Sequence, residues 1–224
     1  MIALIPAHNE AARIDATVRA TRTVAAIDRI LVIDDASTDG TADLAASAGA
    51  EVLRLETNLG KGGALQSGLD LVAADAEALV LLDGDLGATA AEAGTLLEPV
   101  LAGAADMTIA TLPKPPASGG FGLVKGLARW GIRRLSGFEP TAPLSGQRAL
   151  SRAAWEAATP FATGYGVEVG LTVRAARAGM RLLEVPTTMA HAATGRDLAG
   201  FTHRGRQFVQ VAGALVRLAF GRRL

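Results

Sequence analysis

Short apolar runs alternate with segments of helical spacing over the first half of the chain. The apolar runs are IALIPA, RILVID, EVLRL, ALVLL and DMTIA, at residues 2–7, 29–34, 51–55, 78–82 and 106–110. Between them, apolar positions recur at helical steps over about 10–25, 38–48, 61–73 and 89–103. Near-continuous apolar strands that alternate with helices are typical of a parallel sheet covered on both faces. We therefore expect an α/β fold with a mostly parallel central sheet flanked by helices.

The regular alternation ends near residue 110. The segment LPKPPASGGFG at 112–122 has three prolines and three glycines, which predicts a loop, and we interpret it as a lid that orders when a ligand binds. Further on, the pattern predicts a helix over 123–135, a short strand within 143–151 followed by a helix that ends before Pro160, and a strand over 181–186. The stretch 164–179 reads as a glycine-rich entry, a helix and a glycine stop. From about Asp197 a final helix carries one apolar stripe, formed by Phe201, Phe208, Val211, Leu215, Leu218 and Ala219.

Polar residues follow four of the predicted strands in succession. They are His8-Asn9-Glu10 after the first strand, Asp34, Asp35, Ser37, Thr38 and Asp39 after the second, residues 58–63 after the third, and Asp83-Gly84-Asp85 after the fourth. In open sheets of this class, ligands bind beyond the carboxyl ends of the parallel strands. The four clusters therefore predict one ligand site at that edge, although Asp39 also fits a simple role as a cap of the helix that follows it.

Asp83 and Asp85 place two like charges one residue apart behind an apolar strand. A divalent cation resolves their repulsion, because Mg²⁺ and Mn²⁺ prefer carboxylate and phosphate oxygens as ligands. Gly84 between them permits close backbone approach. The alternative is a surface turn, for which Asp-Gly is a common dipeptide, but the three neighbouring polar clusters favour the metal site.

Length and composition indicate one domain in a reducing compartment. A chain of 224 residues can bury one sizeable core, and the lack of cysteine excludes disulfides and cysteine-ligated metals. The start, MIALIPAHNE, lacks the layout of a signal peptide, and no uncharged apolar run approaches the roughly 18 residues that span a bilayer. We therefore expect a cytoplasmic protein whose contact with the membrane, if it has one, is peripheral and on the inner face.

The net charge of zero hides a strong division along the chain. Residues 1–110 carry 6 Lys/Arg and 17 Asp/Glu, a balance of −11, whereas residues 111–224 carry 16 and 5, a balance of +11. Such asymmetry indicates that the two halves meet different partners, with simple attraction between the halves as the alternative. We expect the basic half to meet an anionic small molecule or surface, and we expect no nucleic-acid partner.

Four motifs occur in order over the first half: LIPAHNE, LVIDDASTDGT, NLGKGGALQSGL and LLDGD. With these motifs the sequence resembles the family 2 glycosyltransferases of the GT-A fold, well over residues 2–110 and loosely beyond. The resemblance implies one Rossmann-like GT-A domain over 1–224, with a nucleotide-sugar-binding half at 1–110 and an acceptor half at 111–224. It also implies a UDP- or GDP-linked sugar donor and a divalent metal, Mg²⁺ or Mn²⁺, at the Asp-x-Asp element.

The resemblance also implies roles for individual residues of the first half. By position in the motifs, the donor's nucleoside and phosphates would meet Pro6, Ala7, Glu10, Asp35 at the base, Lys61, Asp83 at the ribose, and Gly84. Asp85 would be the direct metal ligand, with Asp83 in the metal shell. One departure is Ala36, where the family usually has glycine, and from it we expect that the backbone at this position is not left-handed.

The second half lacks two signatures of the family, the Glu-Asp pair of inverting members and the Gln-x-x-Arg-Trp motif of processive synthases. Glu168 in GYGVEVGL is the candidate general base, with a helix N-terminal glutamate favoured by the helix dipole as the alternative. His191 is a candidate metal ligand, with a plain exposed histidine as the alternative. Arg196 is a candidate phosphate ligand, and Ser145 and Gly146 of PLSG are candidates for the acceptor side.

Two kinds of acceptor fit the second half. Its basic residues favour a polyprenyl phosphate, and so does a final helix that can lie on an anionic membrane surface. The alternative for that helix is that it packs on the domain. The PLSG and GYGVEVGL stretches are similar to retaining glucosyl-3-phosphoglycerate synthases, whose acceptor is a small phosphorylated acid and which would need no protein base. A nucleotidyltransferase needs a glycine- and arginine-bearing loop after the first strand, where this chain has AHNEAAR.

Overall fold

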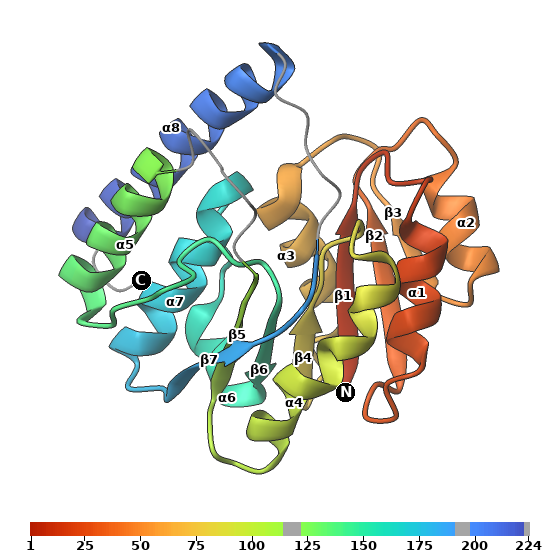
Figure 1. The fold of residues 1–224 in the computed structure, drawn as a ribbon, viewed down its shortest axis with the longest axis horizontal. Helices are drawn as coiled ribbons and strands as arrows, with labels where there is room; N and C mark the ends of the chain where they lie inside the picture. Colours follow the sequence, from red (N-terminus) through yellow and green to blue (C-terminus); the bar gives the residue numbers. More distant parts are fainter. Residues whose placement is uncertain (114–121, 191–197, 222–224) are drawn as a thin grey trace.

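A computed structural model describes residues 1–113, 122–190 and 198–221 (Figure 1). Within these residues, seven strands form one sheet in the order β3-β2-β1-β4-β6-β5-β7. The strands are β1 (Ile2–Ala7), β2 (Arg29–Asp34), β3 (Glu51–Arg54), β4 (Ala78–Leu81), β5 (Met107–Thr111), β6 (Arg148–Ser151) and β7 (Leu182–Pro186). Strand β6 runs antiparallel to its neighbours β4 and β5, and the other pairs are parallel. The expected mostly parallel α/β sheet is confirmed.

The helices of the described residues flank this sheet. They are α1 (Ile14–Arg22), α2 (Thr41–Ser47), α3 (Gly60–Val72), α4 (Ala93–Leu101), α5 (Gly122–Ser136), α6 (Arg152–Ala158), α7 (Val167–Arg177) and α8 (Leu198–Phe220), with short 3₁₀ turns η1 (Gly87–Glu92) and η2 (Gly164–Gly166). Helix α1 begins four residues later than the spacing suggested. The backbone amides of residues 9–11 donate to side chains of the loop after β2 and of the first residue of α2 instead of entering the helix.

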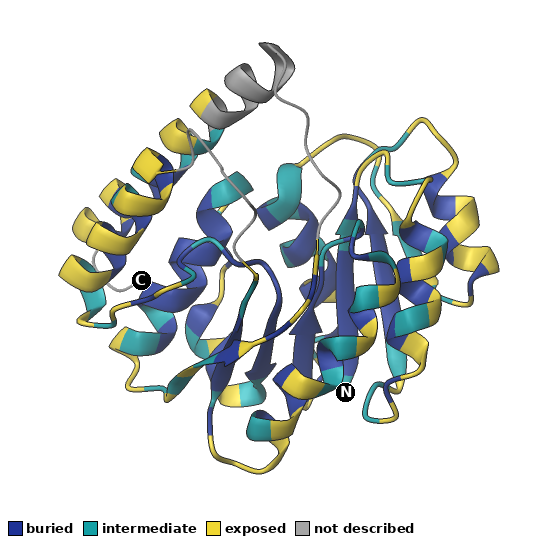
Figure 2. Ribbon diagram, viewed as in Figure 1, coloured by how far each residue is buried: buried dark blue, intermediate teal, exposed yellow. Residues whose placement is uncertain are grey.

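Alternate residues of the central strands pack on opposite faces of the sheet. In β1, Ile5 belongs to the same apolar cluster as Val18 of α1, whereas Leu4 belongs to the cluster of Leu65 of α3. Leu4 and Ile5 are both 0% exposed, and burying each contributes about 1.5–3 kcal/mol. Figure 2 shows the central strands buried between the two helical layers, and β1, β2 and β4 are buried almost throughout, which is why their sequences read as continuous apolar runs.

Helices α5 and α8 form an outer layer against α7 (Figure 1). The apolar residues between these helices are Val124, Ala128, Ile132, Val169, Val173, Val211, Leu215 and Leu218. The predicted stripe of the final helix is therefore buried at Val211, Leu215 and Leu218, but Phe208 and Ala219 are exposed. The side chain of Phe201 lies outside the described residues. None of the helices in the described part of the chain has the length and hydropathy needed to cross a membrane.

Candidate functional site

The loops that follow β1 and β4 pack directly against each other at the carboxyl edge of the sheet. A Cβ placed on Gly84 would lie 3.3 Å from Ala7 Cβ, 3.4 Å from Glu10 Cγ and 3.5 Å from the carbonyl oxygen of Pro6. The carbonyl oxygen of Gly84 also accepts a hydrogen bond from the Thr17 hydroxyl, at 2.8 Å. The Asp-Gly-Asp segment is thus held against the first loop, and the close approach explains the glycine at its centre.

The loops after β1 and β2 are joined by hydrogen bonds from side chain to backbone. Asn9 Oδ1 accepts the N–H of Thr38 at 2.9 Å, and Asp39 Oδ2 accepts the N–H of Ala11 at 3.1 Å. Asp39 Oδ1 also accepts the N–H of Thr41, the first residue of α2, at 3.1 Å. The N-cap residue of α2 is Gly40, but Asp39 does accept the first N–H of the helix, and it fixes both loops in addition.

The carboxylate of Asp35 lies at the start of α3 and is 4% exposed. Its Oδ1 accepts the N–H of Leu59 at 2.7 Å, and its Oδ2 accepts the N–H of Gly60 at 2.9 Å. Negative charge is favourable at a helix N-terminus, where these N–H groups have no partner within the helix. Each carboxylate oxygen can accept a further bond, so the role of Asp35 toward a nucleoside base stays a prediction.

Ala36 adopts the left-handed backbone that we did not expect at this position. Its φ is +60°, so the inference from the missing glycine was wrong. The turn is fixed by the N–H of Ala36, which donates to the carbonyl of Asp34 at 3.0 Å, and by the N–H of Ser37, which donates to Asp34 Oδ1 at 3.3 Å. A left-handed alanine costs roughly 1–2 kcal/mol, which the hydrogen bonds of the loop offset.

Lys61, Asp83 and Glu168 form a chain of alternating charges at the centre of this edge. Lys61 Nζ lies 2.5 Å from Asp83 Oδ1 and 2.9 Å from Glu168 Oε1. The side chains are only 19%, 21% and 6% exposed, so water screens the pairs weakly. Burial acts against the ammonium charge, but the carboxylates of Asp83 and Glu168 outweigh it and raise the pKa of Lys61 above its ordinary value. Lys61 is therefore a cation throughout the physiological pH range.

The sequence analysis missed Gln147, which holds Asp83 from the other side. Gln147 is fully buried, and its Nε2 donates to Asp83 Oδ2 at 2.7 Å while its Oε1 accepts the hydroxyl of Ser145 at 3.3 Å. A Cβ on Gly146 would collide with Lys61 Nζ and lie 3.0 Å from Asp83 Oδ2. The predicted acceptor residues Ser145 and Gly146 thus lie beside the charged chain, and Gln147 fixes the orientation of its first carboxylate.

Arg148, the next residue, is a fully buried cation that anchors this loop. Its Nε donates to the carbonyl of Ser145 at 2.9 Å and its Nη1 to Thr172 Oγ1 at 2.8 Å, while Nη2 has no hydrogen-bond partner in the described part of the chain. Burial lowers the pKa of Arg148 to about 10, although Glu168 and Glu184 act in the opposite direction. The sequence signal was a Gln-Arg pair at the start of a short strand, since Arg148 is the first residue of β6.

The acidic residues at this edge suit a hard cation. Burial, and then the carboxylates of Asp85 and Asp83, raise the pKa of Glu10, so the three groups lie close enough to repel one another. Among residues 1–113, 122–190 and 198–221, no group of three or more His, Cys, Asp or Glu side chains is arranged to hold a metal by itself. Mg²⁺ is usually held by one or two carboxylates together with substrate phosphates, and Asp83 and Asp85 fit that pattern.

Several predicted features lie outside the described residues. They are His191, Arg196 and most of the predicted lid at 112–122. The roles predicted for them stay predictions.

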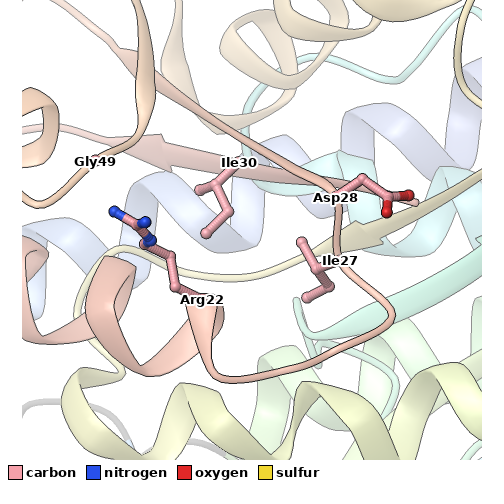
Figure 3. Close-up of a pocket in the computed structure, with 5 residues that line it drawn as sticks. All are labelled: Arg22, Ile27, Asp28, Ile30 and Gly49. Atoms are coloured by element: carbon pink, nitrogen blue, oxygen red, sulfur yellow. The ribbon is translucent and has the colours of Figure 1, made fainter.

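A separate cavity of about 260 Å³ opens at the opposite edge of the sheet (Figure 3). It is lined by Arg22, Ile27, Asp28, Ile30 and Gly49. Asp28 pairs there with the N-terminal ammonium group, and Arg22 Nη1 donates to the carbonyl of Ala48 at 3.1 Å. None of the predicted site residues lines this cavity, and both of its charged groups already have protein partners.

Comparison with known proteins supports the motif analysis. Residues 2–141 match the family model described as glycosyl transferase family 2. Glycosyltransferase AglJ of Haloferax volcanii is 31% identical over 198 residues, which cover 87% of this chain and 64% of AglJ. The undecaprenyl-phosphate mannosyltransferase of Micrococcus luteus is 31% identical over 217 residues, which cover 88% of this chain and 86% of that protein. The chain thus spans slightly less than two thirds of AglJ and most of the mannosyltransferase.

The fold also matches solved structures. The glucosyl-3-phosphoglycerate synthase of Mycobacterium tuberculosis, in complex with Mg²⁺ and UDP, superposes with a TM-score of 0.80 and 27% identity over 97% of this chain and 78% of that chain. A complex of the same synthase with Mn²⁺, UDP-glucose and phosphoglyceric acid gives a TM-score of 0.77 and 26% identity over the same shares. The resemblance and the fold class predicted from the sequence are confirmed.

Proposed function

This chain belongs to glycosyl transferase family 2, and from that premise we propose that it transfers a sugar from a nucleoside-diphosphate sugar to an anionic acceptor. The observation that carries the proposal is the chain of charges formed by Lys61, Asp83 and Glu168 at the carboxyl edge of the sheet, beside Asp85 and Glu10. A buried cation between carboxylates, next to a surplus of acidic groups, suits a ligand that brings both a metal ion and a diphosphate.

On the donor side, we assign the nucleoside pocket to Pro6, Ala7, Glu10, Asp35 and Gly84. Two properties support this. The loops that carry these residues are fixed by mutual hydrogen bonds, and Gly84 lets the loop after β4 pack closely against Pro6, Ala7 and Glu10. A rigid pocket loses little conformational entropy when the donor binds. The solved complexes of the glucosyl-3-phosphoglycerate synthase contain UDP or UDP-glucose, which supports UDP ahead of GDP as the nucleotide of the donor.

Asp83 and Asp85 are the residues that would hold Mg²⁺ or Mn²⁺, with His191 as a further predicted ligand. The bound cation would neutralise charge that develops on the leaving diphosphate. Lys61 contributes a second positive charge at the same place, since its Nζ lies 2.5 Å from Asp83 Oδ1. Gln147 keeps Asp83 oriented while the other carboxylate oxygen is engaged.

The role of Glu168 depends on the acceptor. A polyprenyl phosphate is already an anion at neutral pH, so its oxygen needs no protein base. Retaining transfer to 3-phosphoglycerate would need no protein base either, so Glu168 is the candidate base only for inverting transfer to a hydroxyl acceptor. In the first case Glu168 serves to hold Lys61, as its Oε1 lies 2.9 Å from Nζ.

We propose a polyprenyl phosphate as the acceptor. The mannosyltransferase named for undecaprenyl phosphate aligns over most of its own length, and α8 presents an apolar outer face. On that face Val209, Val216 and Phe220 are 68%, 56% and 83% exposed, opposite the buried stripe. Residues 198–224 hold five arginines and no acidic residue, which suits contact with an anionic membrane surface. The fold similarity to glucosyl-3-phosphoglycerate synthase favours 3-phosphoglycerate as the second candidate.

Product analysis tests the proposal. The protein is incubated with Mn²⁺ and UDP-glucose, UDP-galactose or GDP-mannose, and with either undecaprenyl phosphate or 3-phosphoglycerate. We expect a glycolipid product with the polyprenyl phosphate, and transfer only to 3-phosphoglycerate would establish the second candidate.

Asp85→Asn should abolish Mn²⁺-dependent binding of UDP in calorimetry, because one ligand charge is lost. Full binding by that variant would contradict the metal role of Asp85.

A further inference from the structure

Helix α8 reaches the turn that precedes Glu168 through one polar side chain. Gln210 projects from the inner side of α8, where Val211, Ala214 and Leu215 are all buried and apolar. Its Oε1 accepts the backbone N–H of Tyr165 in η2 at 2.8 Å. The outer helix α8 is therefore hydrogen bonded to the turn that lies next to the charged side chains Lys61 and Glu168 of the site.

The same turn is clamped between α8 and the first turn of α3 by close backbone contacts. On the α8 side, a Cβ on Gly164 would collide with Gln210 Oε1, and a Cβ on Gly166 would lie 2.5 Å from Ala214 Cβ. On the α3 side, a Cβ on Gly62 would collide with the carbonyl oxygen of Ala162 and lie 3.0 Å from the nitrogen of Gly164. Because the turn has glycines at these contacts, it approaches both helices closely, so a shift of α8 moves the turn.

The two partners of the buried ion pair, Lys61 and Glu168, lie on helices that begin beside this turn. Lys61 lies between Gly60 and Gly62 in the first turn of α3, and Glu168 follows Gly166 by two residues in the first turn of α7. Their 2.9 Å separation therefore depends on how the turn sits against α3. We infer that Gln210 is a positioning residue, which sets the distance between Lys61 and Glu168 through its hydrogen bond to Tyr165.

This inference rests on the proposed function, because the rate of the proposed sugar transfer is the main quantity that tests it. Gln210→Leu keeps the size of the side chain but removes the acceptor, and Gln210→Glu keeps an oxygen that can accept the same N–H. We expect Gln210→Leu to lower kcat about tenfold while KM for the donor changes by less than about twofold, because misplaced groups slow the reaction more than they weaken binding. Gln210→Glu should restore kcat to within about twofold of the unchanged protein.

Gln66 offers a matched control, because its Oε1 accepts the N–H of Phe161 at 2.7 Å and ties the same segment to α3. Gln66→Leu removes a comparable bond at the far end of the segment and should leave kcat within about twofold. An unchanged kcat in Gln210→Leu, or an equal loss in Gln66→Leu, would overturn the inference. Should Gln210→Leu fail to fold, Gln210→Asn, whose shorter side chain withdraws the acceptor, replaces it.

Failure of the proposed function has a different signature. If the unchanged protein transfers no sugar to either acceptor, the proposed function fails, and the positioning role is then tested by crystallography alone. In that case the distance between Lys61 Nζ and Glu168 Oε1 should lengthen beyond ion-pair contact in Gln210→Leu. A distance that stays at 2.9 Å in the variant would overturn the inference independently of activity.

Discussion

At the scale of single residues, the site is organised by the balance of a few charges. Lys61 joins two carboxylates, and Gln147 holds one of them without adding charge. Asp85 and Glu10 then leave the edge acidic. Such a surplus weakens the fold in the absence of a cation, and it is the property by which a cation would be attracted.

Glu10→Gln tests this surplus through pH. Because burial and the neighbouring carboxylates raise the pKa of Glu10, the folded state binds its proton more tightly than the unfolded chain does. The fold therefore gains from protonation below the ordinary glutamate pKa and loses this gain as pH rises through the raised value. Without metal, Glu10→Gln should be more stable than the unchanged protein at pH 7, by up to about 1 kcal/mol, and no more stable at pH 4. Urea unfolding at both pH values measures it, and an equal difference at both would contradict the reasoning.

At the scale of elements, helix termini bring the chemistry together. Lys61 and Glu168 lie in the first turns of α3 and α7, and both turns pack against η2 with glycines at the contact points. The Asp35 carboxylate caps α3 from the end of β2. The site therefore depends on how closely three short backbone segments approach, and side-chain size at these glycines controls that approach.

Gly62→Ala tests the close approach, with Gly94→Ala in α4 as its control. A Cβ at 62 collides with a backbone carbonyl that has little freedom to move, whereas a Cβ at 94 lies 3.5 Å from the side chain of Val24. We expect Gly62→Ala to lose about 1–3 kcal/mol of unfolding free energy and to weaken UDP binding, since Lys61 is displaced with it. Gly94→Ala should gain up to about 1 kcal/mol from helix propensity. Chemical unfolding and calorimetry give both values, and similar effects of the two substitutions would count against the clamp.

The strands, the helices and the first-half clusters could be predicted, because continuous apolar runs and strand-end polar residues have simple physical causes. We expected site residues only beyond the carboxyl ends of parallel strands, and we therefore missed Gln147 and Arg148. Strand β6 is antiparallel and presents its amino end at the same edge. A local pattern does not reveal strand direction. The backbone of Ala36 was also missed, because hydrogen bonds of the turn to Asp34 hold it in the left-handed region against the intrinsic preference of alanine.

At the scale of the whole molecule, the acidic and basic halves of the chain supply different parts of the fold. The acidic first half supplies the strands β1 to β4 and the carboxylates of the site, whereas the basic second half supplies α5, α7 and α8. On α8 the exposed apolar stripe faces away from the protein, with Arg217 beside it. This arrangement would bring a lipid-linked phosphate to the edge of the sheet while the donor enters from the other side.

Vesicle binding tests the outer face of α8. Liposomes that contain phosphatidylglycerol should bind the protein, and added salt should weaken the binding because surface charges are screened. Val216→Asp should lower the partition coefficient about tenfold, since it replaces apolar contact by like-charge repulsion. Leu101→Asp is the matched control, as Leu101 in α4 is 57% exposed and Val216 is 56% exposed. Equal losses in both variants, or no binding by the unchanged protein, would contradict a lipid-facing role.

The place of β6 between β4 and β5 also constrains how the chain can be made. During synthesis, β4 emerges some seventy residues ahead of the strand that will cover its open side. Until that strand arrives, one edge of β4 and both edges of β5 present unpaired backbone N–H and C=O groups, the kind of surface that promotes association between nascent chains. A ribosome-bound fragment that ends before residue 148 should therefore depend on chaperones, and this dependence should fall once β6 has left the exit tunnel and fall further once β7 has followed it.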